Sequence, residues 1–185
     1  MTCRRSRIGL ALCLFFFING ALFSSIPRLC AQSRDESAVR AAYVFNLIRY
    51  VDWPPDKRQL DIGIVGSSSA GDLMQSMLNG RTTDLHTIRV LQSPTGDELQ
   101  QCGIVYIADQ SSAALQIGRL KNKTALTIGE SESFVRDGGM VALVKVGDHI
   151  QIYINLEAAQ RAGVKISSRV LSLAVLVKPA QNAKN

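Results

Sequence analysis

Residues 103–129, GIVYIADQSSAALQIGRLKNKTALTIG, contain the pattern that decides the fold. Residues 104–108 form a continuous apolar run, which is typical of a strand covered on both faces. Residues 111–120 then predict a helix, and residues 124–129 form a second apolar run that ends at a glycine. A buried strand, a helix and another buried strand in succession predict two parallel strands joined by a helical crossover.

The alternation of strands and helices extends in both directions from this unit. Upstream, residues 60–65 predict a strand, residues 70–78 a helix and residues 86–91 a half-covered strand. Downstream, residues 140–146 and 149–154 predict a hairpin, and two helices follow at residues 156–162 and from residue 168 to about residue 177. We expect an α/β fold with a mostly parallel sheet flanked by helices and a C-terminal antiparallel hairpin at the edge.

A helix is also predicted at residues 41–55, AAYVFNLIRYVDWPP, and we expect Trp53 and the two prolines to end it. Its apolar side chains cover more than half of its circumference, which is more than one face of a core can bury. We predict that Tyr43, Phe45 and Tyr50 contact a second subunit or a partner protein. The alternative is that neighbouring loops, such as residues 54–60, fold back over them.

The first 31 residues have the pattern of a secretory signal peptide. Arg4, Arg5 and Arg7 precede an apolar stretch over residues 8–23, and small residues follow near Ala31. A membrane anchor is the alternative, but the apolar stretch is borderline in length and is interrupted by Asn19-Gly20. We expect cleavage after Ala31, a single α/β domain over residues 32–180 and a frayed tail at residues 181–185.

Removal of this segment changes the charge of the chain. The whole sequence has 21 Lys and Arg against 15 Asp and Glu. Four of the arginines and none of the acids precede residue 32, so the expected mature chain has 17 basic and 15 acidic residues. A net charge near +2, without a basic run or interleaved aromatic residues, argues against a nucleic-acid-binding protein.

The cysteines point away from redox and zinc chemistry. Three of the four precede residue 32, so the expected mature chain keeps only Cys102. One cysteine cannot close an intramolecular disulfide or build a structural zinc site. Because Cys102 stands directly before a predicted buried strand, we expect a core thiol.

No set of residues predicts catalysis, a metal site or a cofactor. Residues 66–72 lie where a strand leads into a helix, but they lack both nucleotide-binding spacings and favour an ordinary capped turn. His86 and His149 have no second ligand at metal spacing, and Glu130 and Glu132 favour a solvated turn. We expect a binding protein that is not an enzyme. Small-molecule binding near residues 66–71 and 129–133 stays open.

Several motifs resemble one family of exported regulators, the YfiR family. They are an Ala-Ala-Tyr-x-Phe-Asn helix that runs into Trp-Pro, Gly-Gly-Met before the hairpin, Ile-Asn-Leu-Glu-Ala-Ala, and Ala-Gly-Val-Lys-Ile-Ser-Ser. The resemblance covers nearly the whole expected mature chain. It implies a small Rossmann-like periplasmic protein, commonly a homodimer, that binds the periplasmic domain of an inner-membrane diguanylate cyclase and represses it. Repression would lower cyclic di-GMP and biofilm formation.

The resemblance also implies disulfides, and here the sequence departs from the family. Better-known relatives carry one disulfide that joins the early strand to the region of Cys102 and another near the Gly-Gly-Met turn. Residues 62–64 offer no cysteine for the first, and residues 129–150 contain none for the second. The sequence therefore does not support a redox-sensing or disulfide-stabilising role for this chain, and leaves any role of Cys102 in redox chemistry open. Two alternatives to cyclase repression stay open: a periplasmic small-molecule-binding protein, and a sensory module for another membrane receptor.

The C-terminal segment, residues 155–174, supplies the expected partner surface. Glu157, Arg161, Lys165 and Ser168 are charged or polar and lie close to a helix start. Their apolar neighbours, such as Ile166 and Leu171, are expected in the core. A merely solvated helix face is the alternative.

Overall fold

The computed structural model describes residues 28–53 and 58–179. Contacts divide the chain into a unit of residues 1–33 and a unit of residues 34–185, and the fold given below is that of the second unit. Residues 1–27 of the expected signal peptide, and the expected tail, lie outside the described residues. The expected cleavage site after Ala31 falls within helix α1 (Arg28–Arg49). In the described ranges, no helix has both the length and the hydropathy to cross a membrane.

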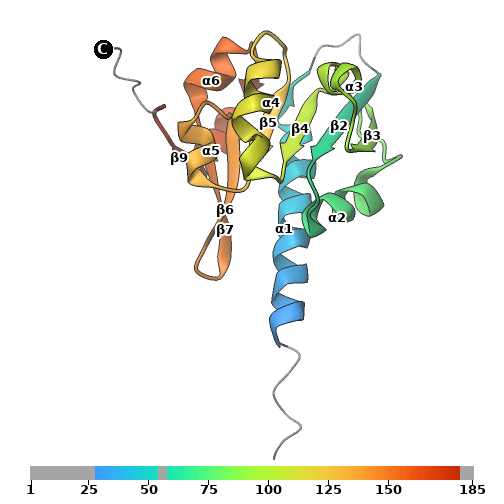
Figure 1. Ribbon diagram of the computed structural model, residues 1–185, viewed down its shortest axis with the longest axis vertical. Coiled ribbons are helices and arrows are strands. Elements are labelled where there is room, and N and C mark those ends of the chain that lie inside the picture. The colour runs from blue at the N-terminus through green and yellow to red at the C-terminus, as the bar shows by residue number, and fades with distance from the viewer. Residues whose placement is uncertain (1–27, 54–57, 180–185) are drawn as a thin grey trace, which may run out of the picture. The chain divides into compact units, whose positions relative to one another are not determined.

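The main sheet has seven strands, which are β2 (Gln59–Val65), β3 (Thr87–Gln92), β4 (Ile104–Ile107), β5 (Leu126–Gly129), β6 (Val141–Val146), β7 (His149–Ile154) and β9 (Val175–Leu176). Their order across the sheet is β3-β2-β4-β5-β6-β7-β9 (Figure 1). Strands β3, β2, β4, β5 and β6 are parallel to one another, and β6 and β7 form an antiparallel hairpin. The expected fold class, a mostly parallel α/β sheet flanked by helices with a C-terminal antiparallel hairpin, is confirmed, but the hairpin does not form the edge of the sheet, because β9 pairs with β7.

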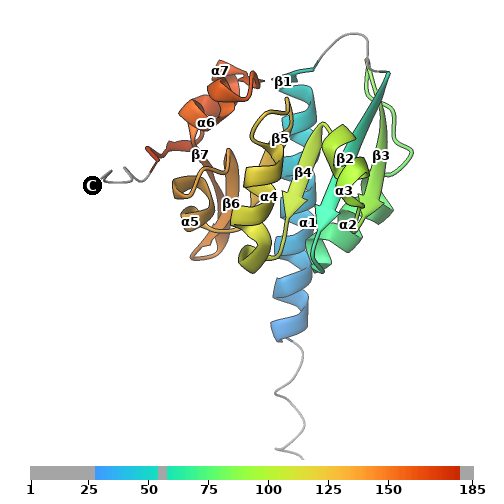
Figure 2. The ribbon, with the colours of Figure 1, turned by 45° about the horizontal axis from the view of Figure 1, so that its top comes forward.

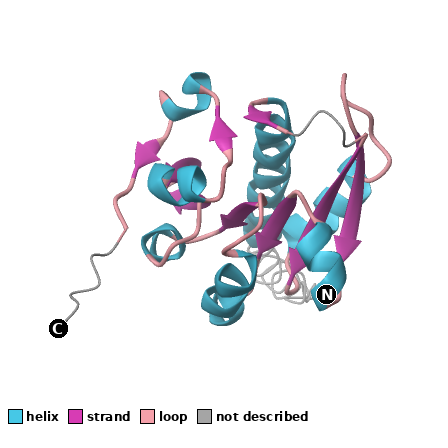
Figure 3. Cartoon of the chain, turned by 90° about the horizontal axis from the view of Figure 1, so that it is seen from above, coloured by secondary structure: helices cyan, strands magenta, loops and turns pink. Residues whose placement is uncertain are grey.

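Helices cover both faces of the sheet (Figure 3). Besides α1 they are α2 (Ser69–Leu78), α3 (Gly96–Gln101), α4 (Ala113–Leu120) preceded by a 3-10 turn at Gln110–Ser112, α5 (Glu132–Arg136), α6 (Leu156–Arg161) and α7 (Ser168–Leu171). Buried side chains of α1 and α2 share one apolar cluster with Ile62 and Ile64. Those of α3, α4 and α5 share a second cluster with Val105 and Ile107. Each strand in the middle of the sheet is therefore buried on both sides, as its continuous apolar run predicts.

The opening helix ends earlier than its sequence predicts. α1 stops at Arg49, and Val51–Asp52 form a short strand, β1, that pairs antiparallel with β8 (Lys165–Ile166). Trp53 Nε1 donates a hydrogen bond of 2.8 Å to the Ile48 carbonyl, near the end of the helix. The partner strand lies more than a hundred residues further along the chain, so no local pattern could predict this pairing.

The predicted helix over residues 168–177 is wrong in its second half. α7 ends at Leu171, and Val175 and Leu176 form β9, which adds a parallel strand beyond the hairpin. The Val177 amide donates a hydrogen bond of 2.8 Å to the Ile154 carbonyl of β7. β-branched residues at 175 and 177 favour the extended backbone, and the neighbouring strand supplies the hydrogen bonds that a helix would otherwise provide.

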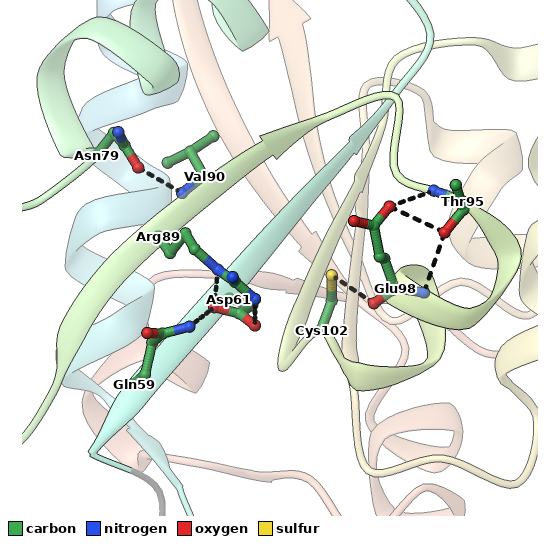
Figure 4. Close-up of polar contacts among 8 residues, drawn as sticks. All are labelled: Gln59, Asp61, Asn79, Arg89, Val90, Thr95, Glu98 and Cys102. Atoms are coloured by element: carbon green, nitrogen blue, oxygen red, sulfur yellow. Dashed lines mark hydrogen bonds and ion pairs between the residues drawn. The ribbon is translucent and has the colours of Figure 1, made fainter.

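The opposite edge of the sheet, at β3, is covered by the chain itself. Asn79 Oδ1 accepts a hydrogen bond of 2.9 Å from the Val90 amide (Figure 4). The Ile88 amide donates to the Arg81 carbonyl, and the Gly80 amide donates to the Ile88 carbonyl, both at 2.8 Å. These bonds occupy backbone groups that an edge strand would otherwise offer to another chain.

Helix α3 is not anticipated by the sequence analysis. Thr95 Oγ1 accepts from the Glu98 amide at 3.4 Å, and Glu98 Oε2 accepts from the Thr95 amide at 2.8 Å (Figure 4). This reciprocal pair is a capping box. The spacing Thr-x-x-Glu was available in the sequence as a signal for it.

Candidate functional site

A tyrosine, a glutamate and an arginine meet at the carboxyl ends of β4 and β5. Tyr106 Oη donates a hydrogen bond of 2.6 Å to Glu130 Oε1, and Arg40 Nε of α1 lies 3.8 Å from Glu130 Oε2. Tyr106 is fully buried, and this burial, reinforced by the charge of Glu130, raises the pKa of its hydroxyl well above 10. The hydroxyl therefore stays protonated and donates. The cluster connects α1 to the sheet and leaves no free nucleophile.

The polar side chains beside this cluster also bond to one another. Ser131 Oγ donates to Gln110 Oε1 at 2.7 Å, and Gln110 Nε2 donates to Ser133 Oγ at 3.2 Å. The hydroxyl and the amide of Ser111 both donate to Asp109, and these bonds lower the pKa of the Asp109 carboxyl. Across the described ranges, no three His, Cys, Asp or Glu side chains form a group that could hold a metal ion. These hydrogen bonds stabilise the loops that follow β4 and β5.

The segment 66–72 is a strand-to-helix turn. Ser68 Oγ accepts a hydrogen bond of 3.0 Å from the Gly71 amide and caps α2. Gly66 has a φ of +87°, and a Cβ at this position would lie 2.8 Å from Asp109 Cβ, so glycine is required for the turn.

Of the two histidines, His86 is buried just before β3 and His149 is exposed at the start of β7.

The three aromatic residues predicted to contact a partner are each partly buried against the core. Tyr43 Oη donates a long hydrogen bond of 3.4 Å to the Ile150 carbonyl in β7. The Arg81 guanidinium carbon lies 4.9 Å from the centre of the Phe45 ring, within the range of a cation–π contact. The Tyr50 carbonyl accepts from the Ser167 amide at 2.9 Å. Contacts within the chain thus account for part of the surplus apolar surface of α1.

The four polar residues predicted at the partner surface lie on three successive elements, α6, β8 and α7, and all four are exposed. Only two of them form an ion pair with each other: Arg161 Nη1 donates to Glu157 Oε1 at 2.7 Å, one helical turn away. Lys165 lies opposite Asp52 in the β1–β8 pair, and Ser168 begins α7. Figure 2 shows α6 and α7 together at one end of the fold.

Exposed apolar residues follow directly after this charged group. Leu173 is 78 % exposed and Leu176 is 56 % exposed, and Val175 between them is also exposed. We define the C-terminal surface as these three residues together with Glu157, Arg161, Lys165 and Ser168. The sequence did not predict that these apolar residues are exposed. A helix over residues 168–177 would have buried one row of apolar side chains in the core.

Cys102 is a buried core thiol, as the sequence predicts. Its Sγ donates to the Glu98 carbonyl at 3.3 Å (Figure 4). At Gly63 of the early strand, an added Cβ would lie 2.9 Å from Cys102 Sγ. Nearby, Arg89 of β3 forms a two-point ion pair with Asp61 of β2 at 2.6 and 3.0 Å, and this carboxylate raises the pKa of Arg89.

Solved structures resemble this fold at low sequence identity. A conserved domain protein from Vibrio cholerae O1 biovar El Tor aligns with a TM-score of 0.52 and 14% identity over 75% of this chain. A protein from Streptococcus pneumonia, described as an ABC domain in complex with L-Trp, aligns with a TM-score of 0.53 and 13% identity over 77% of this chain. The chain spans 60% of the length of each. These likenesses show the fold alone.

Comparison at the level of sequence families is more specific. No curated protein sequence matches the chain. A family model described as YfiR/HmsC-like matches residues 37–175, which extends from α1 to the first residue of β9 and includes every motif on which the sequence resemblance rests. Because the match covers most of the chain, the protein belongs to the YfiR/HmsC-like family.

Proposed function

We propose that this protein is an exported periplasmic regulator that binds the periplasmic domain of an inner-membrane diguanylate cyclase and represses it. The observation that carries the proposal is the family match over residues 37–175. The family supports a regulator of cyclic di-GMP signalling that works by binding. Repression would lower cyclic di-GMP in the cell and reduce biofilm formation. The N-terminal sequence of the protein recovered from the periplasm tests export and cleavage after Ala31.

We assign partner binding to the C-terminal surface. It combines exposed apolar side chains at Leu173 and Leu176 with exposed charged side chains at Glu157, Arg161 and Lys165, and protein–protein interfaces combine an apolar centre with a polar border. Leu173 is 78 % exposed although it is a large apolar residue, and burial of such a side chain against a partner favours association. The exposed Glu157–Arg161 pair would contribute mainly to specificity.

A second contact is assigned to Tyr43, Phe45 and Tyr50 on α1, in a homodimer or in the complex with the cyclase. Each side chain keeps part of its surface exposed while the remainder packs on the core. Phe45→Glu and Tyr50→Glu variants are expected to weaken dimerisation or repression. Variants that keep the wild-type mass in light scattering and still repress would overturn this contact.

The test of the main proposal is co-expression with the candidate cyclase, followed by purification of the periplasmic chain and measurement of cyclic di-GMP. We expect the cyclase to co-purify and cyclic di-GMP to fall when the chain is present. Leu173→Asp places a charge in the apolar centre and should weaken binding about tenfold or more. Glu157→Lys should weaken binding less and alter its salt dependence.

The chain offers a matched control on a different helix. Glu132 and Arg136 of α5 form an exposed ion pair with the same spacing as Glu157 and Arg161. Glu132→Lys should therefore perturb the fold as little as Glu157→Lys does, because exposed pairs of this kind contribute only about 0.3–0.5 kcal/mol. If both variants reduce binding equally, the C-terminal surface is not the contact. If the wild-type chain neither binds nor lowers cyclic di-GMP, cyclase repression is wrong, and the protein is then assigned to the small-molecule-binding class, for which ligand screening is the next experiment.

A further inference from the structure

The main sheet ends in two edge strands, β3 and β9, which differ in how the chain treats them. At β3, residues 79–81 bond to the outer backbone groups of Ile88 and Val90. At β9, one side of the strand pairs with β7, and Figure 1 shows β9 at the outer margin of the sheet, beyond the hairpin. Proteins usually protect an edge, because its unpaired N–H and C=O groups bind other strands.

The register of β9 shows which of its backbone groups face away from the sheet. Val175 and Leu176 lie opposite Tyr153 and Ile154 of β7, and the Val177 amide donates to the Ile154 carbonyl. In a strand, the backbone groups of successive residues point to alternate sides. The N–H and C=O of Leu176 therefore both point away from β7, and no hydrogen bond to either is found within the part of the chain that the structure describes.

A second copy of the same strand matches these two groups. In an antiparallel pair, residues that lie directly opposite each other can exchange both of their N–H···O=C bonds. Leu176 makes such an exchange with Leu176 of the second copy when a two-fold axis passes between them, which is the symmetry of most homodimers. By the same alternation, the Lys178 amide then faces the Ala174 carbonyl of the second copy, and the pairing gains about four backbone hydrogen bonds.

The side chains near this axis suit the same register. Val175 lies opposite Val177 of the second copy, and β-branched residues favour cross-strand contact. Lys178 is the one charged residue at positions 174–178 and lies opposite Ala174, so like charges do not meet. Pro179 has no N–H, but its backbone has the orientation of Val177 and removes no donor from the outer side.

We propose that β9 pairs antiparallel with β9 of a second copy, in register at Leu176, so that the two main sheets join into one. The direction, the register and the composition of the pair all follow from this one strand, which a different chain would have to match. The pairing places the homodimer contact at β9 and leaves Tyr43, Phe45 and Tyr50 of α1 for the complex with the cyclase. It also brings the two C-terminal surfaces together beside the axis.

A disulfide cross-link tests the position of the axis. The Cα atoms of a hydrogen-bonded antiparallel pair lie about 5.5 Å apart, which a disulfide can span. With oxidised glutathione as the oxidant, the mature chain carrying Leu176→Cys should form a covalent dimer. Leu173→Cys is the matched control, because Leu173 is more exposed than Leu176 but lies three residues from the axis. Leu176→Cys should cross-link at least about tenfold faster, because pairing raises the local concentration of the second thiol.

Two further variants separate the backbone from the side chain. Leu176→Pro removes the outward N–H from each copy and leaves the bond from Val177 to β7 in place, as an edge strand tolerates. In sedimentation velocity it should weaken association about tenfold or more, because the dimer loses two hydrogen bonds. Leu176→Ala keeps the N–H and should weaken association less.

Hydrogen exchange of the wild-type chain tests the proposal without a substitution. The Leu176 amide should become protected as the protein concentration rises, because the dimer forms its hydrogen bond. The Val177 amide, which is bonded to β7, should be protected equally at every concentration. The contact is short, and small interfaces are typical of transient complexes, so we expect a dimer that dissociates on dilution.

Four outcomes would overturn the proposal. They are a wild-type chain that stays monomeric at every concentration, equal cross-linking of the two cysteine variants, unchanged association in Leu176→Pro, and exchange at Leu176 that does not depend on concentration. Protection of this amide only when the cyclase domain is added would instead make the cyclase the strand that binds this edge. The other measurements need no cyclase, so their result is independent of cyclase repression.

Discussion

Replacement of Tyr106 by phenylalanine would test the buried cluster that joins α1 to the sheet. The variant removes one hydroxyl, which donates a hydrogen bond of 2.6 Å to Glu130 Oε1, and leaves the fully buried ring in place. Hydrogen bonds to charged groups contribute about 1.5–3 kcal/mol to stability. The Glu130 side chain is 31% exposed, so water can replace part of the lost bond. We expect the free energy of unfolding at pH 8 to fall by about 1–2 kcal/mol, measured by urea denaturation.

The same variant has a distinctive pH dependence. Folding raises the pKa of Tyr106, so above pH 10 the folded chain keeps a proton that the unfolded chain releases. The unfolded state then binds fewer protons, and the free energy of unfolding falls by about 1.4 kcal/mol per pH unit because of this group. Below pH 10 Tyr106 is protonated in both the folded and the unfolded state, so its contribution to the free energy of unfolding does not change with pH. The stability difference between wild type and Tyr106→Phe should therefore shrink to about zero near pH 11.

A matched control is available in Tyr153→Phe. The Tyr153 hydroxyl donates a weak bond of 3.3 Å to the neutral Gln151 amide, and its loss should change stability by less than about 0.5 kcal/mol. The stabilising role of the Tyr106 hydroxyl is refuted if Tyr106→Phe is as stable as wild type at pH 8. It is equally refuted if the difference between the two proteins stays constant from pH 9 to pH 11.

Three further substitutions test the packing and the covered sheet edge. Gly139→Ala would bring a Cβ within 2.2 Å of the fully buried Phe134 ring, so we expect a loss of about 3 kcal/mol in urea denaturation. Gly118→Ala in α4 meets nothing within 4 Å and should instead gain about 0.5–1 kcal/mol, and equal effects of the two alanines would contradict the steric argument. Asn79→Ala removes the acceptor of the Val90 amide and should cost about 1 kcal/mol and speed hydrogen exchange at that amide, whereas unchanged exchange would exclude an edge-covering role.

The central part of the fold follows from local sequence. The runs at residues 104–108 and 124–129 are apolar at every position except threonine 124 and 127, and the observed strands β4 and β5 are buried on both faces. Helix boundaries also follow local chemistry: Ser68 and Asn155 cap α2 and α6, and Gly163 with a φ of +71° follows the end of α6. Such features depend on neighbouring residues, which is why the sequence predicts them.

The candidate surfaces were only partly predictable. Sequence placed Glu157 and Arg161 on one exposed helix face, and their spacing of four residues predicts the ion pair that the structure contains. It did not place Leu173 and Leu176 at the surface, because the state of residues 172–177 depends on a hydrogen bond to β7.

By itself, the sequence determined the class of fold, the order of the main strands and helices, and the family, because periodicity, capping residues and motifs are local properties of the chain. Tertiary structure decided the short strands β1, β8 and β9, the partial burial of the α1 aromatic residues and the Tyr106–Glu130–Arg40 cluster. Each of these depends on residues distant in sequence meeting in space. Their free energy comes from pairing and burial that no local window contains.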